Sequence, residues 1–478
     1  MSGGFGTRLR PLTCNIPKPM VPMMNKPMMQ HIVDLLKKHG ITDIVSTLFY
    51  QPDIITGYFG DGAKFGIKMQ YRKAEADYGT AGSVRNAADF LDERFIIISG
   101  DVLTDFDLTK AIEFHEQKKA KATLVLTRAT NPLAFGVVIT DNGGKITRFL
   151  EKPSWGEVFS DTINTGIYII EPEVLKLIPY QKEFDFSKNL FPAMLEQDMG
   201  LYGYIAEGYW RDVGNLNEYQ EAHLDALDDG VKLQHEGNMV GSAFVGPNSV
   251  IETSNENIQG TVLIGKNCRI GKNVKIIKSV IGNDCVVDDG AVIRNSVIWS
   301  DTKIGKGAEL TSCVVAKWCS IGDDAMIRSM TVIYAGNRIG RGFQTGNKAN
   351  IRELNVIGDR VSIGTLTVVE HHVQIEDGVR IHSQAFVPEY SILRAGCWIG
   401  PGTVLTNARF PLHPLAKQQL SGATIESNAK IGAHCTVLPG VKVGANALVG
   451  AGSLVSKDVP SGMVAYGHPA EPQRPIDY

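Results

Sequence analysis

The sequence has few of the features that mark membrane or disulfide-rich proteins. No apolar run approaches the roughly 20 residues that span a bilayer, and no stretch resembles a signal peptide. The seven cysteines are scattered without any CxxC pair, so we expect reduced, mostly buried thiols in a cytoplasmic protein and no zinc or disulfide framework. A net charge of −3, from 48 lysines and arginines against 51 aspartates and glutamates, does not favour nucleic acid as a partner. We therefore expect neither a membrane nor a nucleic acid to be bound.

Two common phosphate-binding signatures are also missing. The chain has no GxxxxGK[ST] loop, and Leu9 replaces the third glycine of a GxGxxG pattern. The start of the chain instead combines glycines with basic residues: Gly3, Gly4, Gly6, Thr7, Arg8, Arg10 and Lys18. Glycines allow a backbone with positive φ whose N–H groups can close on an anion, and the basic side chains add charge. We expect a phosphate-binding loop here.

A chain of 478 residues is too long for one core. Over residues 1–232, alternating helix and strand patterns predict a Rossmann-like α/β domain with a mostly parallel sheet. The clearest elements are two helices, Lys26–His39 and Ala81–Leu91, and three strands, Asp43–Leu48, Ile67–Tyr71 and Phe95–Ser99. The last strand is continuously apolar, as expected for a central strand buried on both faces.

One expected element is missing from this pattern. A phosphate loop of this kind needs a strand in front of it to aim it at the carboxyl edge of the sheet, yet only Met1 precedes Ser2. We therefore expect that the first strand is missing and that Met1 is an internal methionine of that strand.

Two aspartates are candidate metal ligands. Asp101 follows the apolar strand, which places it at the sheet edge where open α/β folds bind ligands. Asp212 follows a second strand pattern. Two carboxylates with substrate phosphates and waters are how proteins usually hold Mg²⁺, so we expect a magnesium site at Asp101 and Asp212.

A second glycine-containing segment opens a helix. Gly79, Thr80 and Gly82 would direct backbone amides and the positive end of the helix toward a nucleotide group. The same residues would also suit the start of a tightly packed helix, so both interpretations stay open.

Taken in order, these motifs resemble the sugar-1-phosphate nucleotidyltransferases. The segments Leu12–Met20 (LTCNIPKPM) and Phe106–Leu108 (FDL) most resemble mannose-1-phosphate guanylyltransferases of bacteria. The resemblance implies that GTP and mannose 1-phosphate give GDP-mannose and pyrophosphate. Related enzymes that use UTP or dTTP with glucose or N-acetylglucosamine 1-phosphate are the alternative. Translation-initiation exchange-factor subunits share both domain types and act through protein contacts, but they generally have eroded catalytic motifs.

The resemblance also implies roles for individual residues. The glycine-rich start would wrap the triphosphate, Gly79–Ser83 would lie by the nucleobase, and Arg8 and Lys18 would stabilise charge during catalysis. Lys152 would neutralise the sugar 1-phosphate. The sugar itself would be contacted by Gly136, Glu151, Asn164 and Thr165. An isolated Glu151-Lys152-Pro153 is otherwise more typical of a solvated turn.

From Gly241 onward the sequence repeats an aliphatic residue every six positions, usually followed by glycine. This pattern predicts a long left-handed parallel β-helix with the aliphatic side chains inside. We divide it into residues 236–340, as in many sugar nucleotidyltransferases, and residues 341–478. The repeat falters at Arg341–Arg352, where we expect a loop or a change of direction.

Residues 353–470 resemble hexapeptide acyltransferases, some of which acetylate amino-sugar nucleotides. The resemblance implies a homo-trimer, or a multiple of it, with acetyl-CoA as a possible co-substrate bound between neighbouring subunits. Asn407–Ser421 breaks the repeat and must form a loop. His382 is the candidate catalytic base because its ordinary pKa is near 6.5, and His371, His372 and His413 are competitors.

Overall fold

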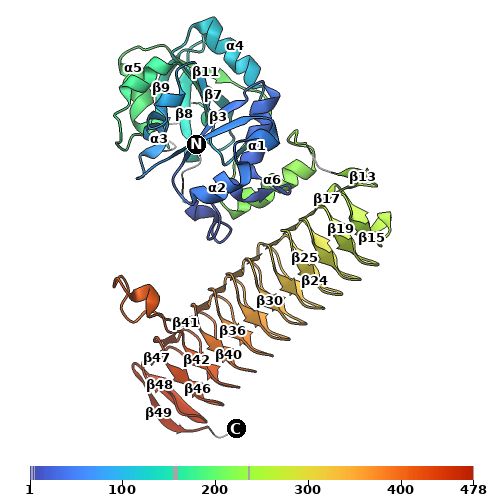
Figure 1. Cartoon of the computed structure of the whole chain (residues 1–478). Helices are drawn as coiled ribbons and strands as arrows, with labels where there is room; N and C mark the ends of the chain where they lie inside the picture. Colours follow the sequence, from blue (N-terminus) through green and yellow to red (C-terminus); the bar gives the residue numbers. More distant parts are fainter. Residues whose placement is uncertain (2–3, 5, 153, 155–159, 235–236, 477–478) are drawn as a thin grey trace. The chain divides into compact units, whose positions relative to one another are not determined.

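The computed structural model describes residues 1, 4, 6–152, 154, 160–234 and 237–476. Two compact units are present. The first comprises Met1–Ala222 and Asp229–Leu233, and the second comprises His223–Asp228 and the chain from Gln234 onward. Figure 1 draws the first unit mainly in blue and green and the second in yellow to red. None of the described helices is both long and apolar enough to cross a membrane.

The first unit is built around a six-stranded sheet in the order β11-β7-β10-β8-β9, with β5 paired to β10. Its strands are β5 (Phe95–Ile97), β7 (Ala122–Arg128), β8 (Gly136–Thr140), β9 (Ile146–Glu151), β10 (Thr162–Ile170) and β11 (Leu201–Ile205). Three two-stranded sheets accompany it: β1 (Pro22–Met23) with β2 (Lys26–Pro27), β3 (Asp43–Leu48) with β4 (Lys68–Lys73), and β6 (Val102–Thr104) with β12 (Trp210–Asp212). The α-helices are α1 (Met28–Lys38), α2 (Pro52–Phe59), α3 (Gly79–Arg85), α4 (Leu108–Lys118), α5 (Phe191–Glu196) and α6 (Leu216–Leu227).

Strand directions differ from the mostly parallel pattern that the sequence predicts. In the described residues β10 is antiparallel to β5, β7 and β8, while the pairs β11–β7 and β3–β4 are parallel. β8 and β9 form an antiparallel hairpin because their connection is too short for a crossover. The long, almost fully buried β10 thus runs through the middle of the sheet.

Several element boundaries also differ. The strand expected at Asp43–Leu48 has those bounds. Helix α1 begins at Met28 because Lys26 and Pro27 pair with β1. Helix α3 ends at Arg85, and the remainder of the expected helix is a short 3-10 turn at Ala88–Phe90.

An apolar cavity of about 380 Å³ lies between β3 and β5. Ile44 and Val45 line it on one side, and Ile96 and Ile97 line it on the other. At its end Met1 bridges to the chain beyond β5: the Met1 amine donates to the Ile98 carbonyl at 2.7 Å, and the Gly100 N–H donates to the Met1 carbonyl at 2.8 Å. This is the hydrogen-bond pattern of a parallel ladder.

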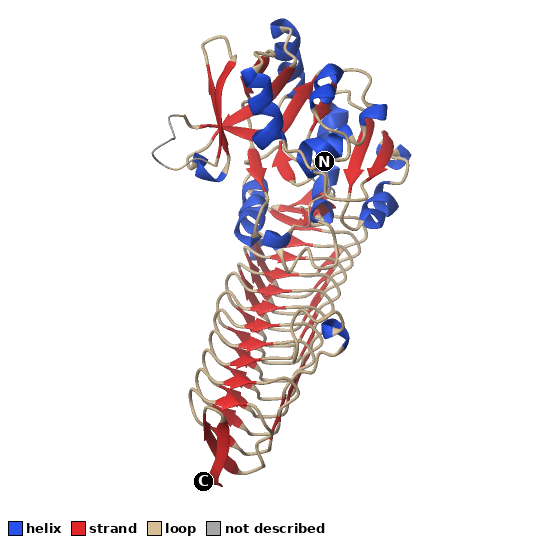
Figure 2. Cartoon of the chain, turned by 90° about the vertical axis from the view of Figure 1, so that its left-hand side faces the viewer, coloured by secondary structure: helices blue, strands red, loops and turns tan. Residues whose placement is uncertain are grey.

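The second unit is a three-faced parallel β-helix (Figure 2). The first face runs from β14 (Ala243–Val245) to β47 (Leu454–Val455), the second from β15 (Val250–Ile251) to β45 (Lys442–Val443), and the third from β16 (Ile258–Gln259) through β46 (Leu448–Val449) to β48 (Met463–Gly467). The aliphatic residues of the repeat fill one continuous core, which confirms their predicted inward orientation.

The repeat continues without a break through Arg341–Arg352. The strands β31 (Gln344–Thr345) and β32 (Asn350–Ile351) pair with the coils on both sides. Phe343 and Ala349 are fully buried in the core. The expected loop or change of direction was wrong, because the coil accepts these residues at interior positions.

The expected interruption at Asn407–Ser421 is present. It leaves the first face after β41 (Val404–Leu405), contains a 3-10 turn at Ala416–Gln418, and returns at β42 (Thr424–Ile425). Figure 1 shows this segment projecting from the coil. Stacking of β41 on β44 (Thr436–Val437) continues beneath it.

Candidate active site

Lys18 lies between two carboxylates that are far apart in the sequence. Its Nζ is 2.6 Å from Asp101 Oδ2 and 3.3 Å from Asp212 Oδ1. The Lys18 side chain is only 9% exposed, and the two aspartates are 27% and 29% exposed. This cluster of three charges, here called the Lys18 triad, is therefore partly shielded from solvent.

Local structure explains why the triad forms. Asp212 ends β12, which pairs antiparallel with β6 so that Asp212 lies opposite Val102. That pairing brings Asp212 beside Asp101. Lys18 enters from a 3-10 turn whose geometry is set by Pro17 before it and Pro19 after it.

The triad also stabilises its own charges. Burial alone would raise the pKa of Asp101, but the Lys18 ammonium and the Ser99 hydroxyl lower it below its ordinary value. Burial alone would lower the pKa of Lys18, and the two carboxylates raise it above its ordinary value. Lys18 and Asp101 are consequently held in their charged forms near neutral pH.

The glycine-rich loop opens onto the cavity that Lys18 and Asp101 line. Gly6 has φ 60°, and a Cβ there would meet Lys18 Cβ at 3.0 Å and Thr13 Cγ2 at 3.1 Å. Only glycine fits this position without strain. A cavity of about 440 Å³ is lined by residues of the loop, the triad and α3, including Gly4, Gly6, Thr7, Arg8, Lys18, Gly79, Thr80 and Asp101. Gly3 lies outside the described residues.

The start of α3 faces the cavity, as a nucleotide-binding segment would, and it is also tightly packed. These are the two interpretations that the sequence left open. Gly79 and Thr80 line the cavity. A Cβ on Gly82 would lie 2.5 Å from the Lys182 carbonyl oxygen, and the Gly82 N–H donates to the Phe184 carbonyl at 3.0 Å. Gly82 is thus required by packing, and its amide already has a partner.

The predicted sugar-binding residues lie together in part. Gly136 is paired with Glu151 in the β8–β9 hairpin, and a Cβ on Gly136 would lie 2.9 Å from Glu151 Oε2 and 3.5 Å from Asn164 Cβ. Burial raises the pKa of Glu151. Lys152 follows with φ 47°, and its N–H donates to the Phe135 carbonyl at 3.1 Å.

Thr165 differs from these residues. Its side chain is 1% exposed, and its hydroxyl donates to the Val125 carbonyl at 2.6 Å. This hydroxyl is used in packing the sheet, so the geometry does not support its predicted contact with a sugar.

The sequence patterns did not identify Asp185 and Ser187, which lie between the residues of the triad cavity and the predicted sugar-binding residues. The Thr80 hydroxyl donates to Asp185 Oδ2 at 2.8 Å, and Asn164 Nδ2 lies 3.3 Å from Ser187 Oγ. Asp185 also lines the triad cavity. No recognised motif surrounds these residues, and only a contact map could have found them.

The donor set of the triad fits a hard divalent cation. Two carboxylates that both reach one ammonium can also reach one metal ion, and their oxygens suit such ions. In the part of the chain that the structure describes, no group of three or more His, Cys, Asp and Glu side chains could hold a metal by itself. Substrate oxygens and water would have to complete the coordination.

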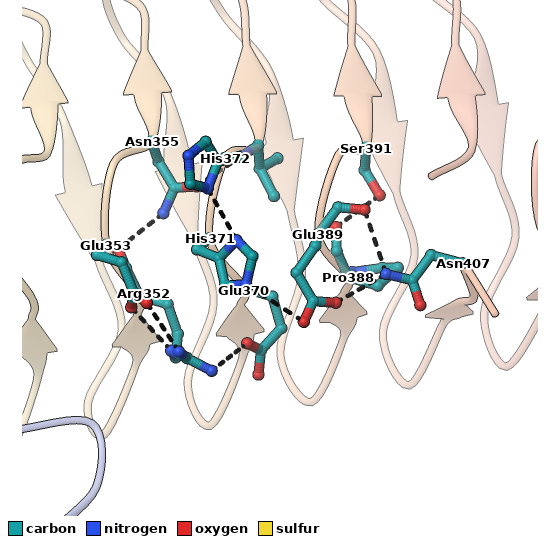
Figure 3. Close-up of polar contacts among 11 residues, drawn as sticks. Arg352, Glu353, Asn355, Glu370, His371, His372, Pro388, Glu389, Ser391 and Asn407 are labelled. Atoms are coloured by element: carbon teal, nitrogen blue, oxygen red, sulfur yellow. Dashed lines mark hydrogen bonds and ion pairs between the residues drawn. The ribbon is translucent and has the colours of Figure 1, made fainter. Parts of the chain in front are cut away.

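The second unit separates residues that the sequence grouped together. His382 follows β37 (Arg380–Ile381) of the third face, whereas the Asn407–Ser421 excursion leaves the first face. They belong to different corners of the coil. His371 is the histidine beside the excursion: its Nε2 lies 3.6 Å from Glu389, and Glu389 accepts from Asn407 Nδ2 at 2.7 Å (Figure 3).

Further charges extend this polar cluster. Arg352 reaches Glu353 at 2.8 Å and Glu370 at 2.7 Å (Figure 3). The Nδ1 atoms of His371 and His372 are 2.8 Å apart. Burial lowers the pKa of His371, so the neutral imidazole is favoured near pH 7.

Family models match three parts of the chain. The model described as nucleotidyl transferase matches residues 1–229, and the EIF2B subunit epsilon LbH domain matches residues 244–345. Residues 422–457 match the bacterial transferase hexapeptide model of six repeats.

Curated relatives cover the first unit and part of the second. A UTP–glucose-1-phosphate uridylyltransferase of Synechocystis is 37% identical over 316 residues, which are 63% of this chain and 81% of that protein. A mannose-1-phosphate guanylyltransferase of Mycobacterium tuberculosis is 33% identical over 305 residues, which are 61% of this chain and 81% of that protein. A mannose-1-phosphate guanyltransferase of Saccharomyces cerevisiae is 34% identical over 256 residues, 51% of this chain and 70% of that protein. The chain therefore belongs to the nucleotidyl transferase family and carries a hexapeptide-repeat β-helix.

Proposed function

We propose that the first unit transfers a nucleotidyl group from an NTP to a sugar 1-phosphate, releasing pyrophosphate. The observation that carries this proposal is the Lys18 triad, of which Lys18 and Asp101 line one cavity with the glycine-rich loop and the start of α3. Glycines, partly buried positive charge and paired carboxylates together suit a triphosphate with its counter-ion. An exchange-factor-like protein that acts only through protein contacts would not need the intact triad.

The chemistry requires no protein nucleophile. An oxygen of the sugar phosphate attacks the α-phosphorus in line, the new P–O bond forms, and the bond to the β-phosphate oxygen breaks so that pyrophosphate leaves. Lys18 is placed to stabilise charge on the transferring group. Arg8, whose side chain is 72% exposed and 3.8 Å from Asp212, is placed to contact the leaving phosphates.

We infer that Mg²⁺ is the metal, held by Asp101 and Asp212, where it would supply positive charge to the phosphates. Lys18 would then be released from the carboxylates toward a phosphate. At the sugar, Lys152 would face the sugar phosphate. Glu151 would accept hydrogen bonds from sugar hydroxyls, and the Asn164 amide would donate to them.

We favour GTP and mannose 1-phosphate as substrates, with UTP and glucose 1-phosphate as the alternative. Several relatives are named for the first activity, and the cyanobacterial relative is named for the second. Pyrophosphate release should be measured with GTP, UTP, dTTP and CTP against mannose, glucose and N-acetylglucosamine 1-phosphates. Release with one pair at least tenfold above all others would identify the substrates, and no release with any pair would contradict the proposal.

A second candidate function is acyl transfer by the later part of the β-helix, with acetyl-CoA as donor. The hexapeptide model and the polar cluster at the excursion favour it. His371 and His382 are alternative bases. Acetyl-CoA binding to the full chain is the direct test. Loss of transfer to an amino-sugar nucleotide in His371→Ala or in His382→Ala would identify the base, and absence of binding would remove this candidate.

We also propose a cytoplasmic location for the protein. The seven cysteines, all within the described residues, form no disulfide, and six of them are buried; a reducing compartment is where such thiols persist.

A further inference from the structure

We propose that a groove on the β-helix, lined by Arg328, Arg360, Arg380 and His382, binds the diphosphate group of a nucleotide-derived ligand. The groove lies within the second unit and goes beyond the function proposed for the first. Its volume is about 570 Å³.

The groove crosses one corner of the coil. Four residues occupy equivalent positions directly after successive strands of the third face: Arg328, Gly346, Gly364 and His382. The coils pack tightly at the two glycines, since a Cβ on Gly346 would lie 2.3 Å from Thr365 N and a Cβ on Gly364 would lie 2.3 Å from Ser383 N. Arg328 and His382 are three coil steps of about 4.8 Å apart, so the groove extends over about 14 Å, which is enough for a diphosphate with part of its substituents.

The groove is strongly positive. Three arginines line it, and none of its described lining residues is a carboxylate. Other arginines of the same β-helix pair with acids: Arg341 with Asp359 at 3.0 Å and Arg352 with Glu353 at 2.8 Å. Asp359 interacts electrostatically with Arg360, while its hydrogen bonds are made to Arg341. An excess of positive charge in a concave site attracts anions.

The side chains at the two ends of the groove are positioned by neighbouring groups. Arg328 Nη1 donates to the Thr345 carbonyl at 2.6 Å. The His382 ring packs on the Trp398 ring with centroids 4.6 Å apart. These contacts reduce the entropy that would be lost when a ligand orders the side chains.

Donor chemistry points to phosphate groups. Guanidinium groups form paired hydrogen bonds with phosphate oxygens, and the hydroxyls of Ser362 and Ser383 also line the groove. Several arginines along an extended groove suit two linked phosphates better than one. A sugar nucleotide and coenzyme A both contain this diphosphate, so the experiment must distinguish these two sources.

Equilibrium binding to the full chain, by calorimetry, tests the proposal. GDP-mannose and UDP-glucose form one arm, and coenzyme A forms the other. The test variant is Arg360→Ala with Arg380→Ala. The matched control is Arg338→Ala, an exposed arginine in β30 (Arg338–Ile339) on the second face. We expect the double variant to lose one binding site, or to weaken it at least tenfold, while the control retains wild-type binding.

The outcomes separate this proposal from the function of the first unit. Pyrophosphate release by the double variant should equal that of the wild type, because the groove lies outside the triad cavity. Loss of the sugar-nucleotide site alone assigns the groove to a sugar nucleotide, and loss of the coenzyme A site alone assigns it to coenzyme A. Unchanged binding of both ligands in the double variant, or an equal loss in Arg338→Ala, would overturn the proposal.

Discussion

Lys18 is the residue around which the first site is assembled. A partly buried ammonium between two carboxylates is stable only while both acids stay ionised. If a metal ion bound the two carboxylates, the Lys18 ammonium would be free to pair with a phosphate. The arrangement therefore suits a site that is occupied by charged substrates during turnover.

The two carboxylates of the triad can be tested by neutral replacements of similar size. Asp101→Asn and Asp212→Asn should each lower kcat by about 100-fold or more, the order lost when a charge-stabilising group is removed from a transferring phosphate. Circular dichroism should show an unchanged fold. Asp92→Asn, at an exposed position outside the cavity, is the control. Near-normal turnover in both triad variants would contradict the assignment.

Arg8 and Lys152 should affect different kinetic parameters. Arg8→Ala should mainly lower kcat because its charge is needed as pyrophosphate leaves. Lys152→Ala should raise KM for the sugar phosphate about tenfold, the effect of losing one charge-assisted hydrogen bond. Steady-state kinetics with each substrate varied separately is the measurement. An unchanged KM in Lys152→Ala would show that this division of roles is wrong.

Stability should depend on the ionisation of Asp101. Because its pKa is lowered in the folded protein from the ordinary 3.8, the ionised carboxylate contributes stability above that value and loses it as the pH falls through the folded-state pKa. The Tm advantage of the wild type over Asp101→Asn should be full near pH ~6 and should shrink below pH ~4. Thermal unfolding across this range checks it, and a constant difference would contradict it.

Among the elements, β3 and β5 have the clearest unmet hydrogen-bonding capacity. In the described residues β3 pairs only with β4, and β5 pairs only with β10. The apolar cavity lies between them, and the bridge made by Met1 has the parallel pattern, so an added strand parallel to β5 could pair there.

An apolar strand supplied at this position should stabilise the first unit. We predict that fusing about five alternating valines and isoleucines in front of Met1 raises Tm by about 2 °C or more, since two or three buried side chains contribute more than 1 kcal/mol. Hydrogen exchange at β3 and β5 should also slow. A fusion of the same length made of glycine and serine is the control, and equal behaviour of the two fusions would argue against a strand-binding cavity.

For the whole molecule, the β-helix buries its own aliphatic core and leaves some large apolar side chains on its outside. Leu354 is 51% exposed and Val356 is 55% exposed. Exposed large apolar side chains of this kind can take part in a protein interface, and the hexapeptide acyltransferases that this region resembles are trimers.

We therefore predict a homo-trimer, or a multiple of it, with at least three times the 52.0 kDa mass of the chain. Light scattering after size exclusion is the measurement. Leu354→Asp with Val356→Asp should lower the mass. Gln374→Asp, at the position stacked on Val356 in the next coil, should leave it unchanged. A monomer at micromolar concentration would contradict the prediction.

Local pattern determined much of this protein. The period of six residues specified the β-helix because each coil needs an aliphatic side chain at each interior position. The strand-then-aspartate order placed Asp101 at the sheet edge. The faltering repeat at Arg341–Arg352 misled because Phe343 and Ala349 fill interior positions as well as the usual aliphatic residues do.

Only the tertiary structure decided which distant residues meet. Asp212 joins Asp101 through the pairing of β12 with β6, and Asp185 reaches Thr80 across a loop that no local pattern marks. His382 and Asn407 lie at different corners, because the corner at which a residue lies depends on the number of residues in each preceding turn. Residues 18 apart, such as Glu389 and Asn407, stack directly. Sequence patterns report the short-range periodicity of backbone geometry, whereas these contacts depend on long-range packing and strand pairing.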